Sequence, residues 1–293
     1  MDRRTYLASL TAGLAALAGC PGGDPGTEPA SPGGSTPTSS VTPTATGTPT
    51  ATPGDGSTPA PEVTVETLHL QYGYVAPDSP DSVGISNPST PYLVTGVAVD
   101  GALDRGDFVV EVGDQAYTPT TPDRFYRTDW GDDRWYEAGR ADGLLLFELP
   151  SEVGREPRLA WPGGERALGD DARARINRGP PDLSVTLDVP ETHAGMEAPP
   201  VSVAVTNDSD LPVYFLGALN RTGPLVAYAP VTRLGDLVAA GETVTIDVAD
   251  EWPSDTPSGT VGDDDPDVRY FLHYGDRRQS ADIRLVDTGR QNV

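Results

Sequence analysis

From residue 62 onward, hydrophobic and polar positions alternate along short segments, the pattern of β-strands that bury one face. Up to residue 179 the expected strands are 63–72, 92–99, 108–112, 144–149, 158–161 and 172–176. From residue 180 they are 183–189, 201–205, 213–216, 225–228, 244–248, 268–274 and 282–286. No segment shows a convincing helical period. The sequence therefore predicts an all-β fold of two tandem immunoglobulin-like β-sandwiches, residues 62–179 and 180–293.

Three local features refine this pattern. The alternation shifts phase once, near Glu66 and Thr67, which predicts a β-bulge in the first strand. The segment from Leu144 to Leu149 is apolar at successive positions, so we expect a strand that is covered on both faces. The run Gly179-Pro-Pro breaks any regular element and is the expected boundary between the two halves.

The first half resembles a known family over about residues 85–176. Pro91-Tyr-Leu-Val-Thr-Gly-Val-Ala-Val99 resembles the opening strand of telokin-like, immunoglobulin-type domains of secreted prokaryotic lipoproteins. The segment 137–150, a glycine followed by an apolar strand that ends in proline, resembles their later signature, and Leu159-Ala-Trp161 fits the strand after it. The resemblance implies an extracellular fold with a binding role and supplies no catalytic residues. Residues 205–209 and 241–246 likewise resemble adhesion-type sandwich modules.

The first twenty residues have the layout of an export signal. Arg3 and Arg4 precede a run of about a dozen apolar residues, which is shorter than the ~20 of a membrane-spanning helix. The paired arginines resemble a twin-arginine signal, although Asp2 stands where that pattern has Ser or Thr. Leu17-Ala-Gly-Cys20 resembles a lipobox, so Cys20 is expected to carry a two-chain lipid that holds the protein on the membrane.

Residues 21–61 consist almost entirely of Pro, Thr, Ser, Gly and Ala. A segment without large apolar residues cannot offset the entropy lost on ordering, so we expect a disordered stalk. Its Pro-Thr repeats are typical of an O-glycosylated stalk, and a bare spacer is the alternative.

The chain carries a formal net charge of −24, and its cationic side chains are all arginine. This acidic, lysine-free composition resembles that of proteins from salt-in halophiles, in which molar salt screens the repulsion over ~3 Å. The carboxylates are therefore expected to form a solvated surface. The composition argues against nucleic acid as a partner, because nucleic-acid binding needs basic patches.

The densest aromatic cluster, residues 125–136, includes Trp130, Trp135 and Tyr136. These side chains are either exposed and bind a ligand such as a sugar ring, or close the core of the first sandwich from a loop that folds back over it.

Two tripeptides, beginning at Asn207 and Asn220, match the N-glycosylation acceptor pattern. Asp263, Asp265 and Asp267 have the spacing of the start of a calcium loop. Val268 and Tyr274 stand where that loop needs Gly and Glu, so a solvated turn is favoured over a metal site. The three histidines fall in separate segments, and no cofactor is expected.

Together these features predict a lipid-anchored protein on the extracellular face of the cell membrane. The expected role is a non-catalytic binding or structural module of the cell envelope, with an envelope glycan or a surface protein as its partner. Two alternatives remain open, an accessory solute-binding lipoprotein of a transporter and a secreted hydrolase. The first alternative would require substantial helix, which the sequence pattern does not show.

Overall fold

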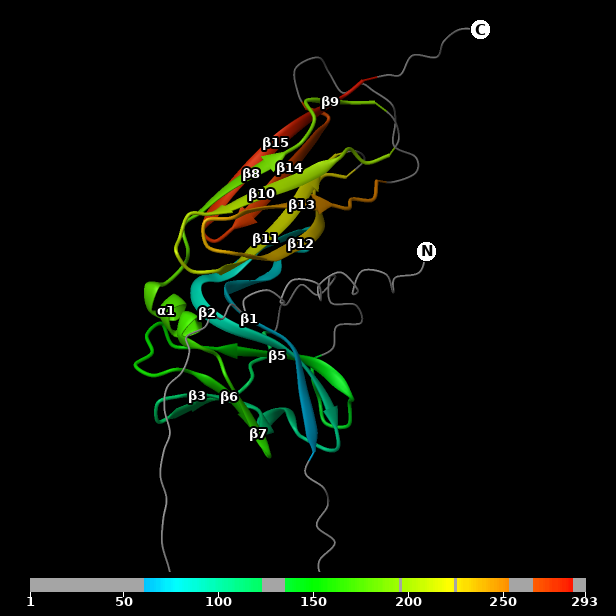
Figure 1. Cartoon of the computed structure of the whole chain (residues 1–293). Helices are drawn as coiled ribbons and strands as arrows, with labels where there is room; N and C mark the ends of the chain where they lie inside the picture. Colours follow the sequence, from blue (N-terminus) through cyan, green and yellow to red (C-terminus); the bar gives the residue numbers. More distant parts are fainter. Residues whose placement is uncertain (1–60, 123–134, 195–196, 224–225, 253–265, 287–293) are drawn as a thin grey trace, which may run out of the picture. The chain divides into compact units, whose positions relative to one another are not determined.

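The computed structural model describes residues 61–122, 135–194, 197–223, 226–252 and 266–286, all within one compact unit that begins at Ser57 (Figure 1). Most of these residues lie in β-strands, which form two pairs of sheets. The all-β prediction is thereby confirmed. The expected signal segment with Arg3, Arg4 and Cys20 lies outside the described residues, as does nearly all of the stalk.

In the first half, a three-stranded sheet packs on a four-stranded sheet. The first sheet has the order β1-β2-β5, formed by β1 (Glu62–Ser79), β2 (Ser82–Asp100) and β5 (Asp142–Glu148). The second has the order β4-β3-β6-β7, formed by β3 (Val109–Val112), β4 (Gln115–Tyr117), β6 (Arg158–Trp161) and β7 (Gly164–Ala167). A short 3-10 helix, η2 (Arg105–Asp107), precedes β3. The core contains Leu93, Phe108, Phe147 and Leu159.

Two details of the first half follow the sequence pattern. The pairing of β1 with β2 shifts register between Val65 and Thr67, at the predicted bulge. Strand β5 is covered on both faces: Leu145 and Phe147 join the core between the sheets, and Leu146 packs with Tyr92 on the other side. Both predictions are confirmed.

Residues 172–176, expected to form a strand, lie instead in helix α1 (Asp170–Arg178). Asp170 and Asp171 occupy its first turn and Arg175 and Arg178 its last, where these charges stabilise the helix dipole. Alanines alternate with arginines through its middle, so the apparent period of two concealed a good helix-forming segment. The helix ends at Gly179, which has a positive φ of 79°. No helix in the described part of the chain has the length and apolar character needed to span a membrane.

The second half is a sandwich of a three-stranded and a five-stranded sheet. The first has the order β13-β10-β8, formed by β8 (Leu183–Asp188), β10 (Val201–Asn207) and β13 (Thr243–Val248). The second has the order β12-β11-β14-β15-β9, formed by β9 (Thr192–His193), β11 (Val213–Thr222), β12 (Ala229–Val238), β14 (Val268–Tyr274) and β15 (Arg277–Leu285). Their core includes Val203, Phe215, Leu219 and Tyr270. The strand expected at 225–228 is wrong for residues 226–228, which precede β12.

The far end of the β1–β2 hairpin packs on the second half. Val75 and Val83 of the hairpin form a buried cluster with Leu216 and Ala218 of β11. Because successive residues of a strand face opposite sides, these two β11 residues lie on the face opposite Phe215 and Leu219. The five-stranded sheet is therefore covered on both faces, by its own sandwich and by the hairpin. We call this hairpin–β11 packing the sealed contact.

Candidate functional site

A break in the pairing of β1 with β2 shapes the site. Tyr72 pairs with Pro91, but Tyr74 pairs with Ser86, so residues 87–90 leave the ladder. Proline at 88 cannot donate a ladder hydrogen bond, and Asn87 adopts a positive φ of 50°. The strand thus bows outward, and this excursion presents Pro88 and Ser89 beside the sealed contact.

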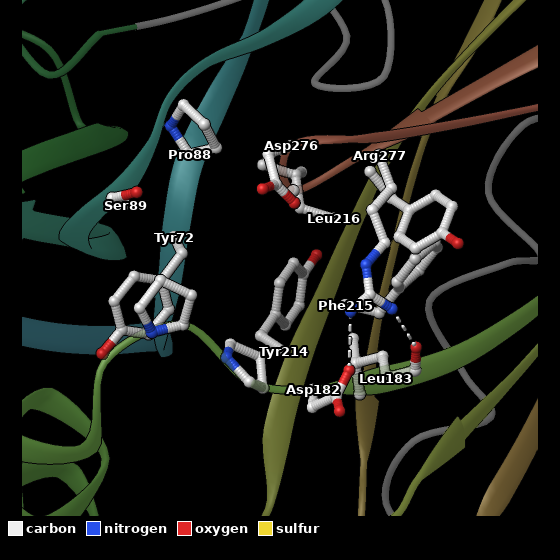
Figure 2. Close-up of a pocket in the computed structure, with 14 residues that line it drawn as sticks. Tyr72, Pro88, Ser89, Asp182, Leu183, Tyr214, Phe215, Leu216, Asp276 and Arg277 are labelled. Atoms are coloured by element: carbon white, nitrogen blue, oxygen red, sulfur yellow. Dashed lines mark hydrogen bonds and ion pairs between the residues drawn. The ribbon is translucent and has the colours of Figure 1, made fainter.

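The excursion forms one wall of a half-open cleft between the two halves, with a volume of about 250 Å³ (Figure 2). Tyr72 adds to this wall from β1, and the segment that follows α1 supplies Pro180 and Pro181. The opposite wall comes from β11 and from the turn that joins β14 to β15. The full lining is Tyr72, Pro88, Ser89, Pro180–Leu183, Tyr214–Leu216 and Tyr274–Arg277.

The ring of Tyr214 is held in place by its neighbours. It stacks on the His69 imidazole with ring centroids 3.7 Å apart and an angle of 15° between the planes. A Cβ added at Gly235 would come within 2.4 Å of Tyr214 Oη, so glycine is needed beside it. Burial lowers the pKa of His69 to about 4, which keeps the imidazole neutral near pH 7. Tyr214 Oη makes no hydrogen bond to any described residue.

The rim of the cleft carries charge. Tyr274 pairs with Arg277, so Gly275 and Asp276 form a two-residue hairpin turn, and Gly275 has a positive φ of 51°. The Asp276 side chain is exposed and has no hydrogen-bond or ion-pair partner in the described structure. Arg277 donates to Asp182 at 2.9 Å and to the Leu183 carbonyl at 3.4 Å. These bonds hold the start of β8 and the residue before it to β15.

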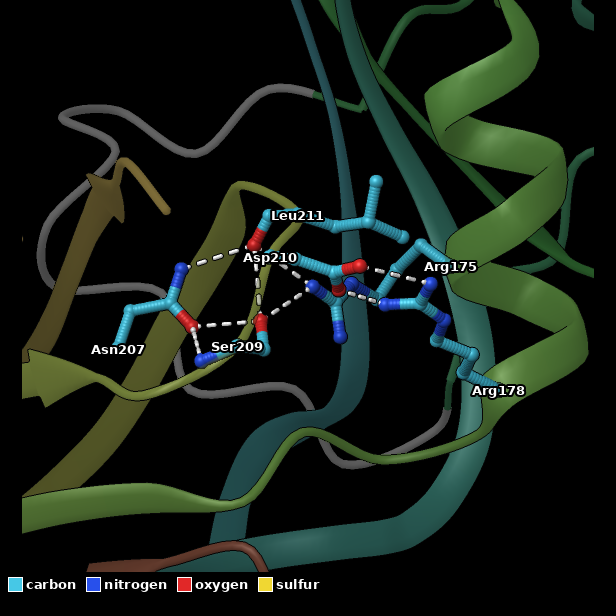
Figure 3. Close-up of polar contacts among 6 residues, drawn as sticks. All are labelled: Arg175, Arg178, Asn207, Ser209, Asp210 and Leu211. Atoms are coloured by element: carbon cyan, nitrogen blue, oxygen red, sulfur yellow. Dashed lines mark hydrogen bonds and ion pairs between the residues drawn. The ribbon is translucent and has the colours of Figure 1, made fainter. Parts of the chain in front are cut away.

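Helix α1 is held to the β10–β11 loop by two arginines (Figure 3). The buried Arg175 guanidinium donates to Ser209 Oγ at 2.9 Å and to the Leu211 carbonyl at 2.7 Å, both in the β10–β11 loop. The Arg175 carbonyl accepts a hydrogen bond of 2.8 Å from Tyr72 Oη. Arg178 forms a second, exposed contact with Asp210 of the same loop. The Tyr72 wall of the cleft is thereby tied to the second half.

Asn207 is a structural residue in the folded chain. Its side chain is fully buried, and its Nδ2 donates to the carbonyls of Leu211, Val238 and Ala239 at 2.8–3.1 Å. Glycosylation would need that nitrogen to be free at the surface. The burial of this nitrogen therefore disfavours glycosylation of Asn207 in the folded protein.

Asn220 is also fully buried, and its amide holds the two halves together. Its Oδ1 accepts a hydrogen bond from Val83 N, and its Nδ2 donates to Val83 O, both at 2.8 Å. The side chain thus satisfies both backbone groups of one hairpin residue across the sealed contact. Burial of the amide nitrogen disfavours glycosylation of Asn220 in the folded protein as well.

The aromatic cluster closes the core of the first half where it is described. Tyr136 is fully buried against Phe108 and donates to the Leu103 carbonyl at 3.0 Å. Trp135 is 8% exposed and packs with Tyr92 and Leu146. Both residues therefore close the core, as the second hypothesis expects, and neither is an exposed ligand-binding side chain. Trp130 lies outside the described residues.

The remaining candidates do not converge on a site. Asp267 accepts a hydrogen bond from Leu285 N at 2.7 Å, and Asp263 and Asp265 lie outside the described residues. The part of the chain that is described contains no cluster of three metal-ligating side chains. None of the histidines lines the cleft: His69 lies behind Tyr214, His193 contacts Trp252, and the pKa of the half-buried His273 is lowered by burial.

Comparison with known proteins adds little to this geometry. No protein-family model and no curated protein matches the chain. Among solved structures, β-glucosidase from Listeria innocua in complex with glucose matches 37% of this chain and 17% of its own, with 14% identity and a TM-score of 0.27. The same enzyme in complex with gluconolactone matches 56% and 21%, with 14% identity and a TM-score of 0.25. The chain thus spans about a fifth of these enzymes, and scores this low support no conclusion about its fold or function.

Proposed function

We propose that this chain is a lipid-anchored cell-surface protein of a halophile, and that its folded part is a non-catalytic binding module of the cell envelope. The cleft between the two sandwiches is the binding site in this proposal. The supporting observation is that the cleft combines an apolar lining with polar groups that have no partner in the described structure, the equipment of a ligand site.

Binding without catalysis is proposed because of the side chains that line the cleft. Its lining contains no histidine or cysteine, and its one arginine is engaged by Asp182. A nucleophile paired with a general base, the usual signature of covalent catalysis, is not found among the residues that line it.

The solute-binding alternative is less favoured by the described structure. Binding proteins of that class close two lobes around the solute by a hinge motion. Here the sealed contact and the Arg175 hydrogen bonds cross between the halves, so opening would expose buried groups. We expect a preformed cleft that does not close.

The proposal is tested by blocking the cleft without reference to the ligand's chemistry. Ser89 is exposed on the excursion of β2, so Ser89→Trp should fill the cleft and leave the core intact. The matched control is Ser151→Trp, at an exposed serine that does not line the cleft. Full-length wild-type protein and both variants are incubated at molar salt with envelope preparations that lack the native protein.

We expect wild type and Ser151→Trp to be retained on the envelope and Ser89→Trp to be released. Equal retention of all three would show that the cleft does not bind the envelope. In parallel, mass spectrometry of the mature N-terminus should find lipid on Cys20, and an unmodified residue there would remove the membrane anchor from the proposal.

A further inference from the structure

We propose that the cleft recognises a neutral sugar ring of an envelope saccharide. This inference rests on the proposed binding function and names the ligand class. The inference is based on polar groups in the cleft that make no hydrogen bond within the described fold and could bond to the hydroxyl groups of a sugar.

Three polar groups of the lining have no hydrogen-bond partner in the described chain: Tyr214 Oη, Ser89 Oγ and the Asp276 carboxylate. The hydroxyls of tyrosine and serine both donate and accept, and the carboxylate accepts. They lie on opposite walls, with Ser89 on the excursion and Tyr214 and Asp276 across from it (Figure 2). A ligand between the walls therefore needs donors and acceptors on both of its edges, as a sugar ring has.

The other polar groups nearby are already satisfied within the fold. Tyr72 Oη donates to the Arg175 carbonyl, and Tyr274 Oη accepts from Gln279 Nε2 at 3.0 Å. Arg277 is paired with Asp182. Among the polar side chains that line the cleft, those without a partner in the described chain are therefore the three named above.

The apolar part of the lining suits the carbon skeleton of a sugar ring. Tyr72, Tyr214 and the prolines at 88, 180 and 181 present flat, rigid surfaces. The His69 stack and Gly235 hold the Tyr214 ring before a ligand arrives, and such pre-organisation lowers the entropic cost of binding. The volume of about 250 Å³ is just below the ~300 Å³ at which pockets for drug-sized ligands begin, so one ring fits.

The charges of the cleft disfavour an anionic ligand. Two carboxylates, Asp182 and Asp276, line the cleft, and its only guanidinium already binds one of them. An anionic ligand would meet the unpaired Asp276, in a protein whose net charge is −24. A proline-rich peptide offers carbonyl acceptors to the Tyr214 and Ser89 hydroxyls but no N–H donor at proline for Asp276, whereas sugar hydroxyls both donate and accept.

The test uses the full-length protein in detergent at molar salt. Saturation-transfer NMR compares methyl glucoside, methyl galactoside and methyl mannoside with glucuronic acid and with a proline-rich decapeptide. We expect at least one neutral glycoside to bind, to bind better than glucuronic acid, and to compete with envelope retention.

Two variants locate the sugar. Asp276→Asn should weaken binding of that glycoside about tenfold or more, because it removes a charged acceptor, and Tyr214→Phe should weaken it about three- to tenfold. The matched controls are Asp114→Asn and Tyr117→Phe, which lie outside the cleft and should bind as wild type does. The Phe variant keeps the ring that stacks on His69, so its fold should be retained.

The outcomes separate this inference from the proposed function. If Ser89→Trp abolishes envelope retention but no neutral glycoside binds or competes, the binding function stands and the sugar assignment is wrong. Preferred binding of the decapeptide would likewise replace the sugar by a peptide. Glycoside binding that is unchanged in both Asp276→Asn and Tyr214→Phe would place the sugar elsewhere and overturn the inference. If Ser89→Trp is retained as well, both proposals fall.

Discussion

The sealed contact and the cleft lie side by side between the same two halves, yet they treat polar groups in opposite ways. In the sealed contact, the Asn220 amide satisfies both backbone groups of Val83, and apolar side chains fill the remainder. In the cleft, Tyr214 Oη, Ser89 Oγ and Asp276 have no partner among the described residues. The first region therefore carries stability, and the second is available to a ligand.

Asn220→Leu should give the largest loss of stability, because it leaves the buried N–H and C=O of Val83 unpaired. At ~1–3 kcal/mol for each unsatisfied group, the free energy of unfolding should fall by about 4 kcal/mol. Chemical denaturation at molar salt measures it. The matched control is Asn177→Leu: the exposed Asn177 makes the same pair of hydrogen bonds to Val153, but these bonds are only partly buried, so a smaller loss is expected. Equal losses of stability in the two variants would contradict the claim that the buried Asn220 contributes more than the exposed Asn177.

Acid should lower the stability of the fold by protonating His69, which stacks on Tyr214. Its folded pKa of about 4 lies below the ordinary value of 6.5, so the unfolded chain binds more protons between these values. The part of the stability that depends on neutral His69 is present above about pH 6.5 and is lost as pH falls to about 4. That part is about 3 kcal/mol at ~1.4 kcal/mol per unit. In His69→Phe, which keeps a ring against Tyr214, the fall across this range should be smaller by that amount. An identical pH dependence in both proteins would contradict the account.

Arg175→Met should cost about 2 kcal/mol, because a buried, charge-assisted pair of hydrogen bonds to the β10–β11 loop is lost. Arg178→Met is its control on the same helix. Arg178 and Asp210 are exposed, so their ion pair should contribute little, and less at molar salt. Thermal melting of both variants measures the difference, and a larger effect at Arg178 than at Arg175 would be unexpected.

The cleft variants should change stability least. Tyr214→Phe and Asp276→Asn remove groups that have no partner in the described fold, so each should shift the free energy of unfolding by less than about 0.5 kcal/mol. A substantial loss in either variant would mean that these groups contribute to the fold rather than to a ligand site.

The strand pattern predicted most of the fold because burial imposes it residue by residue. Strands β10 and β14 alternate between buried and partly exposed positions along their whole length, and the phase shift near Thr67 marks a true bulge. Helix α1 was missed because its Ala and Arg residues alternate over too few turns to show a helical period. The polar strand β15 was recognised only from Asp282 onward, since arginine, glutamine and serine fill its first part.

The cleft could not be predicted in the same way, because its lining comes from five separate segments that only the tertiary packing brings together. One local signal was present: Asn87-Pro88 interrupts a strand pattern and indicates an excursion. The acceptor tripeptides at Asn207 and Asn220 show a different limit of the sequence. A three-residue pattern says nothing about burial, and burial gives both amides a structural role.

The most direct test of the central claim measures envelope retention and thermal stability on one preparation of the double variant Asp276→Asn, Tyr214→Phe. The account predicts that its melting temperature stays within about 3 °C of wild type, while its retention on native envelope at molar salt is lost. Full retention by this variant at an unchanged melting temperature would contradict the claim that the unpaired polar groups of the cleft bind the envelope.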